Sequence, residues 1–88
     1  MNIKYESKFY KDLGGIRDSK LLAKMKEVII DCKAADNITE LKHLKKLQGY
    51  DCFYRIRIGD YRVGIEVLND ELIFTRLLHR KDIYKYFP

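Results

Sequence analysis

Arginines recur at alternating positions in the second half of the chain, where their side chains could bind and activate a phosphate group. Arg55 and Arg57 are separated by one residue, and Arg62 follows shortly after the dipeptide Gly59-Asp60. Guanidinium groups bind phosphate oxygens through paired hydrogen bonds and stay charged at physiological pH. The arginine spacing therefore indicates a phosphate-binding surface.

Two alternating segments predict a β-hairpin that holds these arginines. Residues 52–58 and 61–67 alternate in side-chain character, and only Gly59-Asp60 lies between them. A two-residue loop with glycine first is typical of a type II′ turn. If Ile58 pairs with Tyr61, the apolar side chains share one face of the hairpin and the arginines share the other.

The same register brings two positive charges directly opposite each other. Arg57 then lies beside Arg62, and like charges across a strand pair lower stability by roughly 0.2–1 kcal/mol. Solubility alone would explain each arginine taken singly. Their clustering favours a site for an anion.

A third strand is predicted over residues 71–79, and the length of the turn at Asn69-Asp70 decides which of its side chains join the arginines. A two-residue loop selects Thr75, Leu77 and His79. A three-residue loop selects Phe74, Arg76, Leu78 and Arg80. Burial of Arg76 among apolar side chains would be costly, so we favour the three-residue loop.

A short strand and two helices precede the hairpin. Residues 3–6 are predicted as a strand, and Ser7 as the N-cap of a helix that ends near Gly14-Gly15. Asp18 and Ser19 can cap a second helix, which has the clearest pattern in the chain. Its apolar residues recur at three- and four-residue steps: Leu21, Leu22, Met25, Val28, Ile29 and Cys32.

The remaining segments complete an α+β fold. Residues 37–50 are predicted to form a short helical turn that leads into the sheet, and residues 79–88 a short helical or irregular tail. Within that tail, Tyr86 and Phe87 are expected to pack, whereas Tyr84 suits packing and base stacking about equally. We predict a single domain, residues 1–88, in which an antiparallel sheet packs against the two N-terminal helices. The sheet would consist of the N-terminal strand and a three-stranded meander.

Composition restricts the class of protein. The 88 residues include 18 Lys and Arg against 13 Asp and Glu, and the net charge of +5 suits a phosphate backbone or an acidic protein partner without choosing between them. No run of about 18 apolar residues and no signal core is present, which predicts a cytoplasmic protein that does not enter membranes. Cys32 and Cys52 have no CxxC spacing, so we expect them to pack rather than bind metal, and we expect no cofactor.

Several segments resemble the RelE/ParE superfamily of toxins. The matching segments are Leu47-Gln48-Gly49, residues 54–63 and residues 76–84, which contain Arg-x-Arg, Gly-Asp-Tyr-Arg and His-Arg-x-Asp-x-Tyr. The predicted order of elements matches as well, so the resemblance covers nearly the whole chain. It implies a toxin of a toxin–antitoxin pair. RelE-like members cut mRNA in the ribosomal A site, whereas ParE-like members inhibit DNA gyrase.

The resemblance also implies roles for individual residues. It puts the cleaving groups of the RelE-like nucleases at Arg55, Arg57, Arg62, Arg80 and Tyr84. The best-known RelE pattern has lysines at positions 55 and 57, and arginine cannot act as a base. The general base or acid is therefore open among Glu66, His79 and Tyr84, although a salt bridge to the arginines is the favoured role of Glu66. RNA or ribosome binding is expected of Lys42, Lys45, Lys46, Arg76 and Lys81.

Three functions are compatible with these features. The first is a ribosome-dependent mRNA endonuclease controlled by a RelB-like antitoxin that carries an acidic or amphipathic segment. The second is a gyrase inhibitor of ParE type, and the third is a relic that only pairs with its antitoxin. The arginine set favours the first, because an inhibitor does not need such a cluster. Its partners would be the antitoxin, the ribosome and mRNA.

Overall fold

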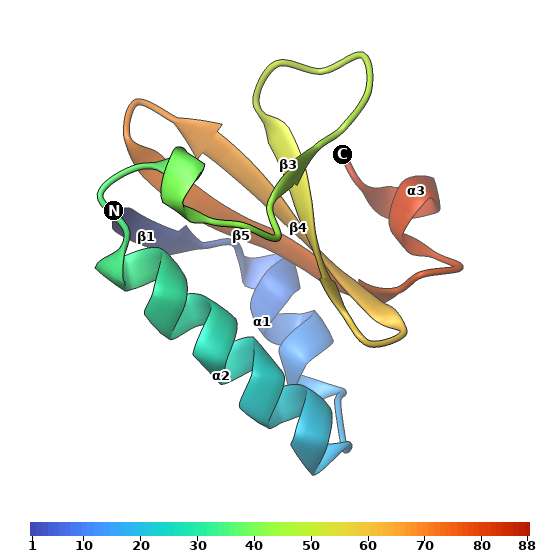
Figure 1. Cartoon of the computed structure of the whole chain (residues 1–88). Coiled ribbons are helices and arrows are strands. Elements are labelled where there is room, and N and C mark those ends of the chain that lie inside the picture. Colours follow the sequence, from blue (N-terminus) through green and yellow to red (C-terminus); the bar gives the residue numbers. More distant parts are fainter.

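One five-stranded sheet organises the molecule. The computed structural model describes residues 1–88, and its strands lie in the order β1-β5-β4-β3-β2. Figure 1 shows α1 and α2 together on one side of this sheet, with α3 apart from them. The predicted α+β class is confirmed. The strands are β1 (Asn2–Tyr5), β2 (Lys45–Lys46), β3 (Phe53–Ile58), β4 (Tyr61–Leu68) and β5 (Glu71–His79). The helices are α1 (Ser7–Gly14), α2 (Ser19–Ala34), the 3-10 turn η1 (Ile38–Glu40) and α3 (Ile83–Tyr86).

The β3–β4 hairpin has the predicted register. Ile58 pairs with Tyr61, and Arg57 lies directly opposite Arg62. Gly59 has a φ of 58° whereas Asp60 keeps a negative φ, as a type II′ turn requires. The arginines therefore share the face of the hairpin that is turned away from α1 and α2.

The predicted three-residue loop before β5 is wrong. Leu68 pairs with Glu71, so the loop is the two-residue turn Asn69-Asp70, and both of its residues have positive φ as a type I′ turn requires. A β-bulge at Thr75 then shifts the register, and its hydroxyl donates to the carbonyl of Gly64 over 2.9 Å. The extra residue moves Arg76 to the arginine face despite the short loop.

The bulge divides β5 into two parts, and the inserted residue reverses the alternation of side chains between the two faces of the sheet from one part to the next. Phe74 pairs with Ile65 on the core face, contrary to the favoured register, whereas Arg76 pairs with Gly64 and Leu78 with Arg62. Arg76 stays off the core face, as the cost of burying its charge requires, but a bulge rather than a longer loop places it there.

Two strands depart from the predicted sheet. β1 runs parallel to β5 rather than antiparallel, and the segment that contains α1 and α2 carries the chain from β1 to β2 at the opposite edge of the sheet. β2 is an additional edge strand in which Lys45 pairs with Arg55. Two residues are too few for an alternating pattern, so the sequence showed only the helical turn before it, which is confirmed as η1.

The main core lies between the sheet and the two N-terminal helices. Asp18 caps α2 as predicted, since its carboxylate accepts from the backbone N–H of Lys20 at 2.9 Å and of Leu21 at 3.3 Å. Ser7 is not the cap of α1: Glu6 holds that position, without a side-chain hydrogen bond. Side chains without appreciable exposure are Phe9, Met25, Cys32, Val63, Ile65, Leu72, Phe74 and Leu77. Burial raises the pKa of the Cys32 thiol to about 11, which keeps it protonated and inert.

A smaller core holds α3 on the opposite face of the sheet. Buried Leu47, Ile83 and Phe87 pack with the half-buried Phe53 and Leu78. The Phe87 ring lies on the backbone of Gly64, where an added Cβ would come within 2.7 Å of the ring. Gly64 is therefore needed for the docking of α3, and packing of Phe87 is confirmed. Tyr86 was expected to pack as well, but its side chain is 61% exposed. None of the helices has the length and apolar character that crossing a membrane demands.

Candidate functional site

Four arginines and one tyrosine gather at the β3–β4 hairpin, and we call them the arginine cluster. β3 and β4 supply Arg55, Arg57 and Arg62, the turn after β5 supplies Arg80, and α3 supplies Tyr84. Desolvation by partial burial lowers the pKa of Arg62, and the positive charges of Arg57, Arg55 and Arg80 lower it further, while the Tyr84 phenol acts in the opposite direction. The structure thus brings together all five residues that the resemblance put in the cleaving positions.

No arginine of the cluster has an acidic partner. The ion pairs of the molecule are Lys4–Glu71, Lys46–Asp51, Arg76–Asp12 and Lys85–Asp82. Arg62 donates through Nη1 to the carbonyls of Gly59 at 2.9 Å and Tyr61 at 2.8 Å, which orients the guanidinium over the end of the hairpin. The backbone N–H of Arg80 donates to the carbonyl of Asp60 over 2.7 Å and ties the turn after β5 to the same end. The result is an oriented, uncompensated positive site that suits a phosphate.

Arg76 has a different role, although it shares the face of the cluster. Its Nε and Nη2 donate to the two carboxylate oxygens of Asp12 on α1, at 2.8 and 3.1 Å. The same carboxylate accepts from the backbone N–H of Leu77 at 3.0 Å, where β5 extends beyond β1. The hydrogen bond to Asp12 raises the pKa of Arg76, whose guanidinium lies 5.9 Å from the ring centroid of Tyr86. Arg76 therefore links α1, β5 and α3, and this charge is already compensated.

This link predicts an effect on stability. Asp12→Asn should lower the free energy of unfolding by about 1 to 2 kcal/mol, because it leaves the half-buried Arg76 without its counter-charge. Denaturant unfolding measures the change. Glu71→Gln is the matched control, because it breaks the more exposed pair with Lys4 and should cost under about 1 kcal/mol. Equal losses in the two variants would mean that the Asp12–Arg76 pair is no more than a surface contact.

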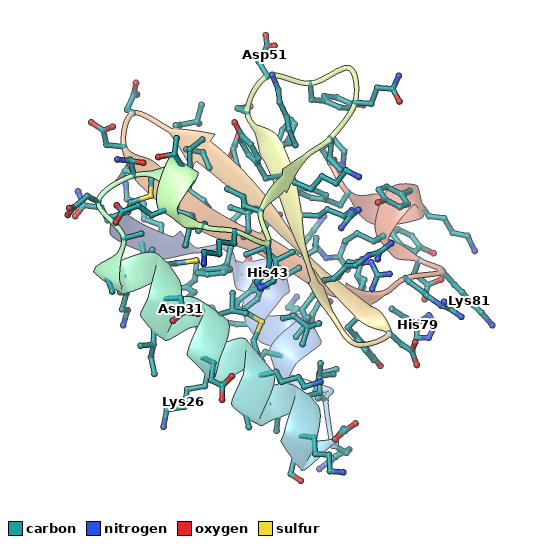
Figure 2. All side chains as sticks on the ribbon, in the orientation of Figure 1. Lys26, Asp31, His43, Asp51, His79 and Lys81 are labelled. Carbon is teal, nitrogen blue, oxygen red and sulfur yellow. The ribbon has the colours of Figure 1, made fainter.

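Of the three side chains predicted as candidate general bases or acids, Tyr84 belongs to the cluster, whereas Glu66 and His79 do not face it. Glu66 forms no ion pair with the arginines, so the favoured salt bridge is wrong. Its carboxylate instead accepts a hydrogen bond from the Cys52 thiol, at 3.9 Å. The ring of Phe87 on Gly64 lies between Glu66 and the hairpin end. His79 pairs with Tyr61 on the helix-bearing side of the sheet, with ring centroids 5.5 Å apart, and its Nδ1 accepts from the Lys81 backbone N–H. Figure 2 shows His79, the last residue of β5, and Lys81 near each other at that end of the sheet.

The predicted ribosome-binding lysines occupy different surroundings. Lys45 pairs with Arg55 and extends the positive row toward the sheet edge. Lys46 points to the other face, and its Nζ lies 3.8 Å from Oδ1 of Asp51. Lys81 is exposed after β5, beside the cluster residue Arg80. Lys42 lines a hollow of about 360 Å³ between α2 and the segment before β2.

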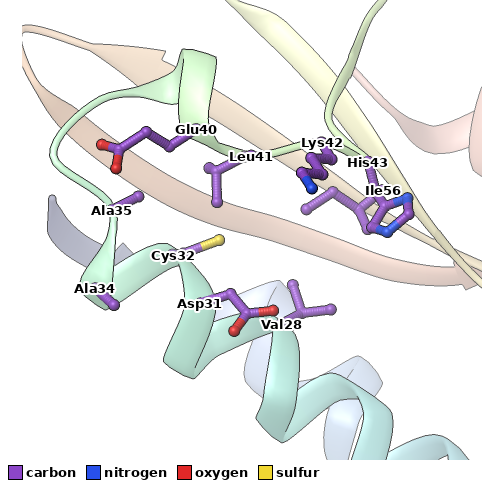
Figure 3. A pocket seen from close by; sticks show the side chains of 10 residues that line it. All are labelled: Val28, Asp31, Cys32, Ala34, Ala35, Glu40, Leu41, Lys42, His43 and Ile56. Carbon is purple, nitrogen blue, oxygen red and sulfur yellow. The ribbon is translucent and has the colours of Figure 1, made fainter.

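That hollow lies on the wrong side of the sheet to serve the arginine cluster. Its lining includes Ile56, Val28 and Cys32, all of which belong to or border the main core (Figure 3). Asp31 and His43 stand at its polar margin, as Figure 3 shows. Nowhere do three or more His, Cys, Asp or Glu side chains gather as a metal site would need.

The sequence matches one protein family over residues 3–84, and that family is described as the ParE toxin of the type II toxin–antitoxin system parDE. The chain belongs to this toxin family. Among curated proteins, the toxin is 43% identical to Toxin RelE3 of Methanocaldococcus jannaschii over the full length of both chains. It is 35% identical to Putative toxin RelE1 of the same organism, over 96% of this chain and 94% of the relative.

Solved structures agree with this assignment. The toxin superimposes on a chain of the RelB-RelE antitoxin-toxin complex from Methanococcus jannaschii with a TM-score of 0.80, 42% identity and coverage of 97% and 99% of the two chains. A chain of the intact E. coli RelBE complex shares the fold at a TM-score of 0.69 and 15% identity, over 89% of the toxin and 94% of that chain. The predicted RelE-like relationship is confirmed.

Three features of the site were not predicted from the sequence. Asp12 gave no signal, because its partner Arg76 is 64 positions away and the helix pattern concerns only apolar residues. Gly64 appeared as an ordinary strand residue, although a glycine inside a strand is itself a sign of close approach by another group. The turn before β3, in which the Tyr50 N–H donates to the carbonyl of Leu47, had no sequence signal beyond the Leu47-Gln48-Gly49 segment of the family resemblance.

Proposed function

We propose that the toxin is a ribosome-dependent endoribonuclease that cuts mRNA by attack of a ribose 2′-hydroxyl. The observation that carries this proposal is the arginine cluster, in which four guanidinium groups have no acidic partner and the Tyr84 phenol lies close enough to Arg62 to affect its pKa. A surface of this kind is costly to maintain without an anion. RNA is a polyanion whose phosphates match the fork geometry of arginine.

The chemistry assigns a role to each member of the cluster. Arg57 and Arg62, opposite each other on the hairpin, would grip the non-bridging oxygens of the scissile phosphate, while Arg55 and Arg80 offset the remaining charge of the phosphorane. A bond forms between the 2′-oxygen and phosphorus, and the bond from phosphorus to the 5′-oxygen breaks. The products are a 2′,3′-cyclic phosphate and a free 5′-hydroxyl. Tyr84 would donate its proton to the departing 5′-oxygen.

The acceptor of the 2′-hydroxyl proton has to satisfy the same geometry. Phe87 packs on Gly64 between Glu66 and Arg62, and the His79 side chain lies on the other face of the sheet, so neither side chain faces the arginine cluster. We therefore propose that the RNA–ribosome complex supplies this acceptor, through a phosphate oxygen or a bound water. A site that is complete only on the ribosome accounts for ribosome dependence.

An antitoxin would have to neutralise the same surface. We propose a RelB-like partner whose acidic and apolar residues cover the arginine cluster or replace α3 on the sheet, because unpaired positive charges and the apolar side chains under α3 occur together there. The crystal structure of the RelB-RelE complex from Methanococcus jannaschii contains a relative of this toxin with its antitoxin.

Expression in cells tests the proposal against its main alternative. Induction without an antitoxin should stop translation and yield mRNA cut within codons, as primer extension on translated and untranslated copies of one message would reveal. Only the translated copy should be cut. The family name favours a second candidate, inhibition of DNA gyrase. Loss of supercoiling with mRNA left intact would support gyrase as the target.

A further inference from the structure

A second hollow, of about 300 Å³, lies beside the arginine cluster, and Tyr84 is its only lining residue with a role in the proposed cleavage. Six residues line it: Leu47, Gln48, Tyr50, Tyr84, Phe87 and Pro88. Leu47 and Phe87 are buried and form an apolar floor, whereas the Tyr50 and Tyr84 side chains are 46% and 63% exposed. The hollow therefore has an apolar floor and aromatic walls that are exposed to solvent.

A defined turn presents two of these side chains. The backbone N–H of Tyr50 donates to the carbonyl of Leu47 at 3.3 Å, and Gly49 has a φ of 85°. These are the features of a type II turn with Gln48 at its first corner. Gln48 is exposed, and its amide carries both hydrogen-bond donors and an acceptor.

The Tyr50 ring is held in place without being covered. It meets the ring of Phe53 at 77° with centroids 5.5 Å apart, and Phe53 meets Phe87 at 85° and 5.6 Å. Phe87 is itself fixed on Gly64. A half-exposed aromatic ring that is oriented by its neighbours loses little freedom when a flat ligand stacks on it.

The position of the hollow next to the arginine cluster indicates which kind of group could bind in it. Tyr84 lines the hollow, and its phenol is close enough to Arg62 to raise the pKa of that arginine, so the hollow and the phosphate site share one side chain. In RNA, each phosphate is flanked by bases that can unstack and pack on aromatic rings. A base next to a phosphate held by the arginines would thus meet Tyr50 and Gln48.

We propose that this hollow binds one nucleobase next to the scissile phosphate, with Tyr50 stacking on it and Gln48 hydrogen bonding to its edge. The inference rests on the proposed nuclease function and adds a base-recognition site to it. It makes Gln48 and Tyr50 determinants of where the toxin cuts.

Removal of the base from the RNA tests the site directly. Ribosome complexes would carry an mRNA in which each A-site nucleotide in turn is replaced by a ribose that lacks the base but keeps its 2′-hydroxyl. On intact mRNA, Tyr50→Ala should lower the single-turnover cleavage rate about tenfold, the scale of one lost stacking contact. At one position the abasic ribose should lower the wild-type rate similarly, and there Tyr50→Ala should cause no further loss.

Three further variants separate recognition from folding. Tyr50→Phe keeps the ring and should cleave at close to the wild-type rate. Tyr10→Ala removes a similarly exposed tyrosine on α1, far from the hollow, and should change neither the rate nor the response to abasic RNA. Gln48→Ala should change the ranking of the four bases at the sensitive position and leave the abasic rate unaltered.

The outcomes distinguish this inference from the function on which it rests. If the effects of Tyr50→Ala and of the abasic ribose multiply at every position, the side chain and the base act independently and the base site is wrong. Full activity of Tyr50→Ala would have the same meaning. A wild-type toxin that cuts no ribosome-bound mRNA would remove the nuclease function, and the base site with it.

Discussion

Replacement of Arg62 by alanine should lower the rate of ribosome-dependent mRNA cleavage by roughly a hundredfold or more, with ribosome binding close to that of the wild type. A preorganised charge that stabilises the transition state contributes on this scale. Arg62 lies directly opposite Arg57 and is oriented by the carbonyls of Gly59 and Tyr61. Single-turnover cleavage at saturating ribosome and a separate binding titration measure the two effects.

Arg17→Ala is the matched control for that experiment. Arg17 is exposed in the connection between α1 and α2, has no ion-pair partner, and lies outside the arginine cluster. Its loss removes one positive charge and should change only the salt-dependent binding, by a modest factor. If Arg62→Ala cleaves as fast as Arg17→Ala, or loses activity only in proportion to folding stability, the cluster serves solubility or binding rather than catalysis.

Removal of the Tyr84 hydroxyl is expected to have the second large effect. Tyr84→Phe should slow cleavage roughly a hundredfold, because the ring remains for stacking while the proton donor to the 5′-oxygen is lost. The side chain is 63% exposed, so the change should leave the free energy of unfolding nearly unaltered. Single-turnover rates on a normal mRNA provide the measurement.

A substrate with a better leaving group makes the assignment of Tyr84 specific. Replacement of the departing 5′-oxygen by sulfur reduces the need for a proton donor, so Tyr84→Phe should be nearly as fast as the wild type on that substrate. Tyr86→Phe is the control on the same helix and should be active on both substrates. A defect of equal size on oxygen and sulfur substrates would mean that the hydroxyl binds or positions the RNA instead.

The sequence predicted the parts of the fold that follow from local pattern. The register of the β3–β4 hairpin follows from alternation and from the position of Gly59, and α2 follows from the spacing of its apolar residues and from Asp18. The same register placed Arg55, Arg57 and Arg62 on one face. These features depend on residues within a few positions of each other.

The features that could not be predicted depend on contacts between distant segments. The β-bulge at Thr75 allows a two-residue turn before β5 while Arg76 stays off the core face. An alternating sequence pattern does not reveal where an extra residue is inserted into a strand. The parallel pairing of β1 with β5 joins strands from the two ends of the chain. The docking of Phe87 on Gly64, which separates Glu66 from the cluster, joins residues 23 positions apart in sequence. For these reasons the general base could not be predicted from the sequence, whereas the hairpin register that groups the arginines could.

One measurement tests the central claim most directly: cleavage by the purified toxin of an mRNA that carries a single 2′-deoxynucleotide on the 5′ side of the cut, in a defined ribosome complex. The all-ribose mRNA should be cut on the ribosome but not when free, and the products should end in a 2′,3′-cyclic phosphate and a 5′-hydroxyl. The deoxy substitution should block cleavage at that bond. Cleavage that continues at the deoxy position, or intact mRNA together with inhibited gyrase supercoiling, would contradict the account.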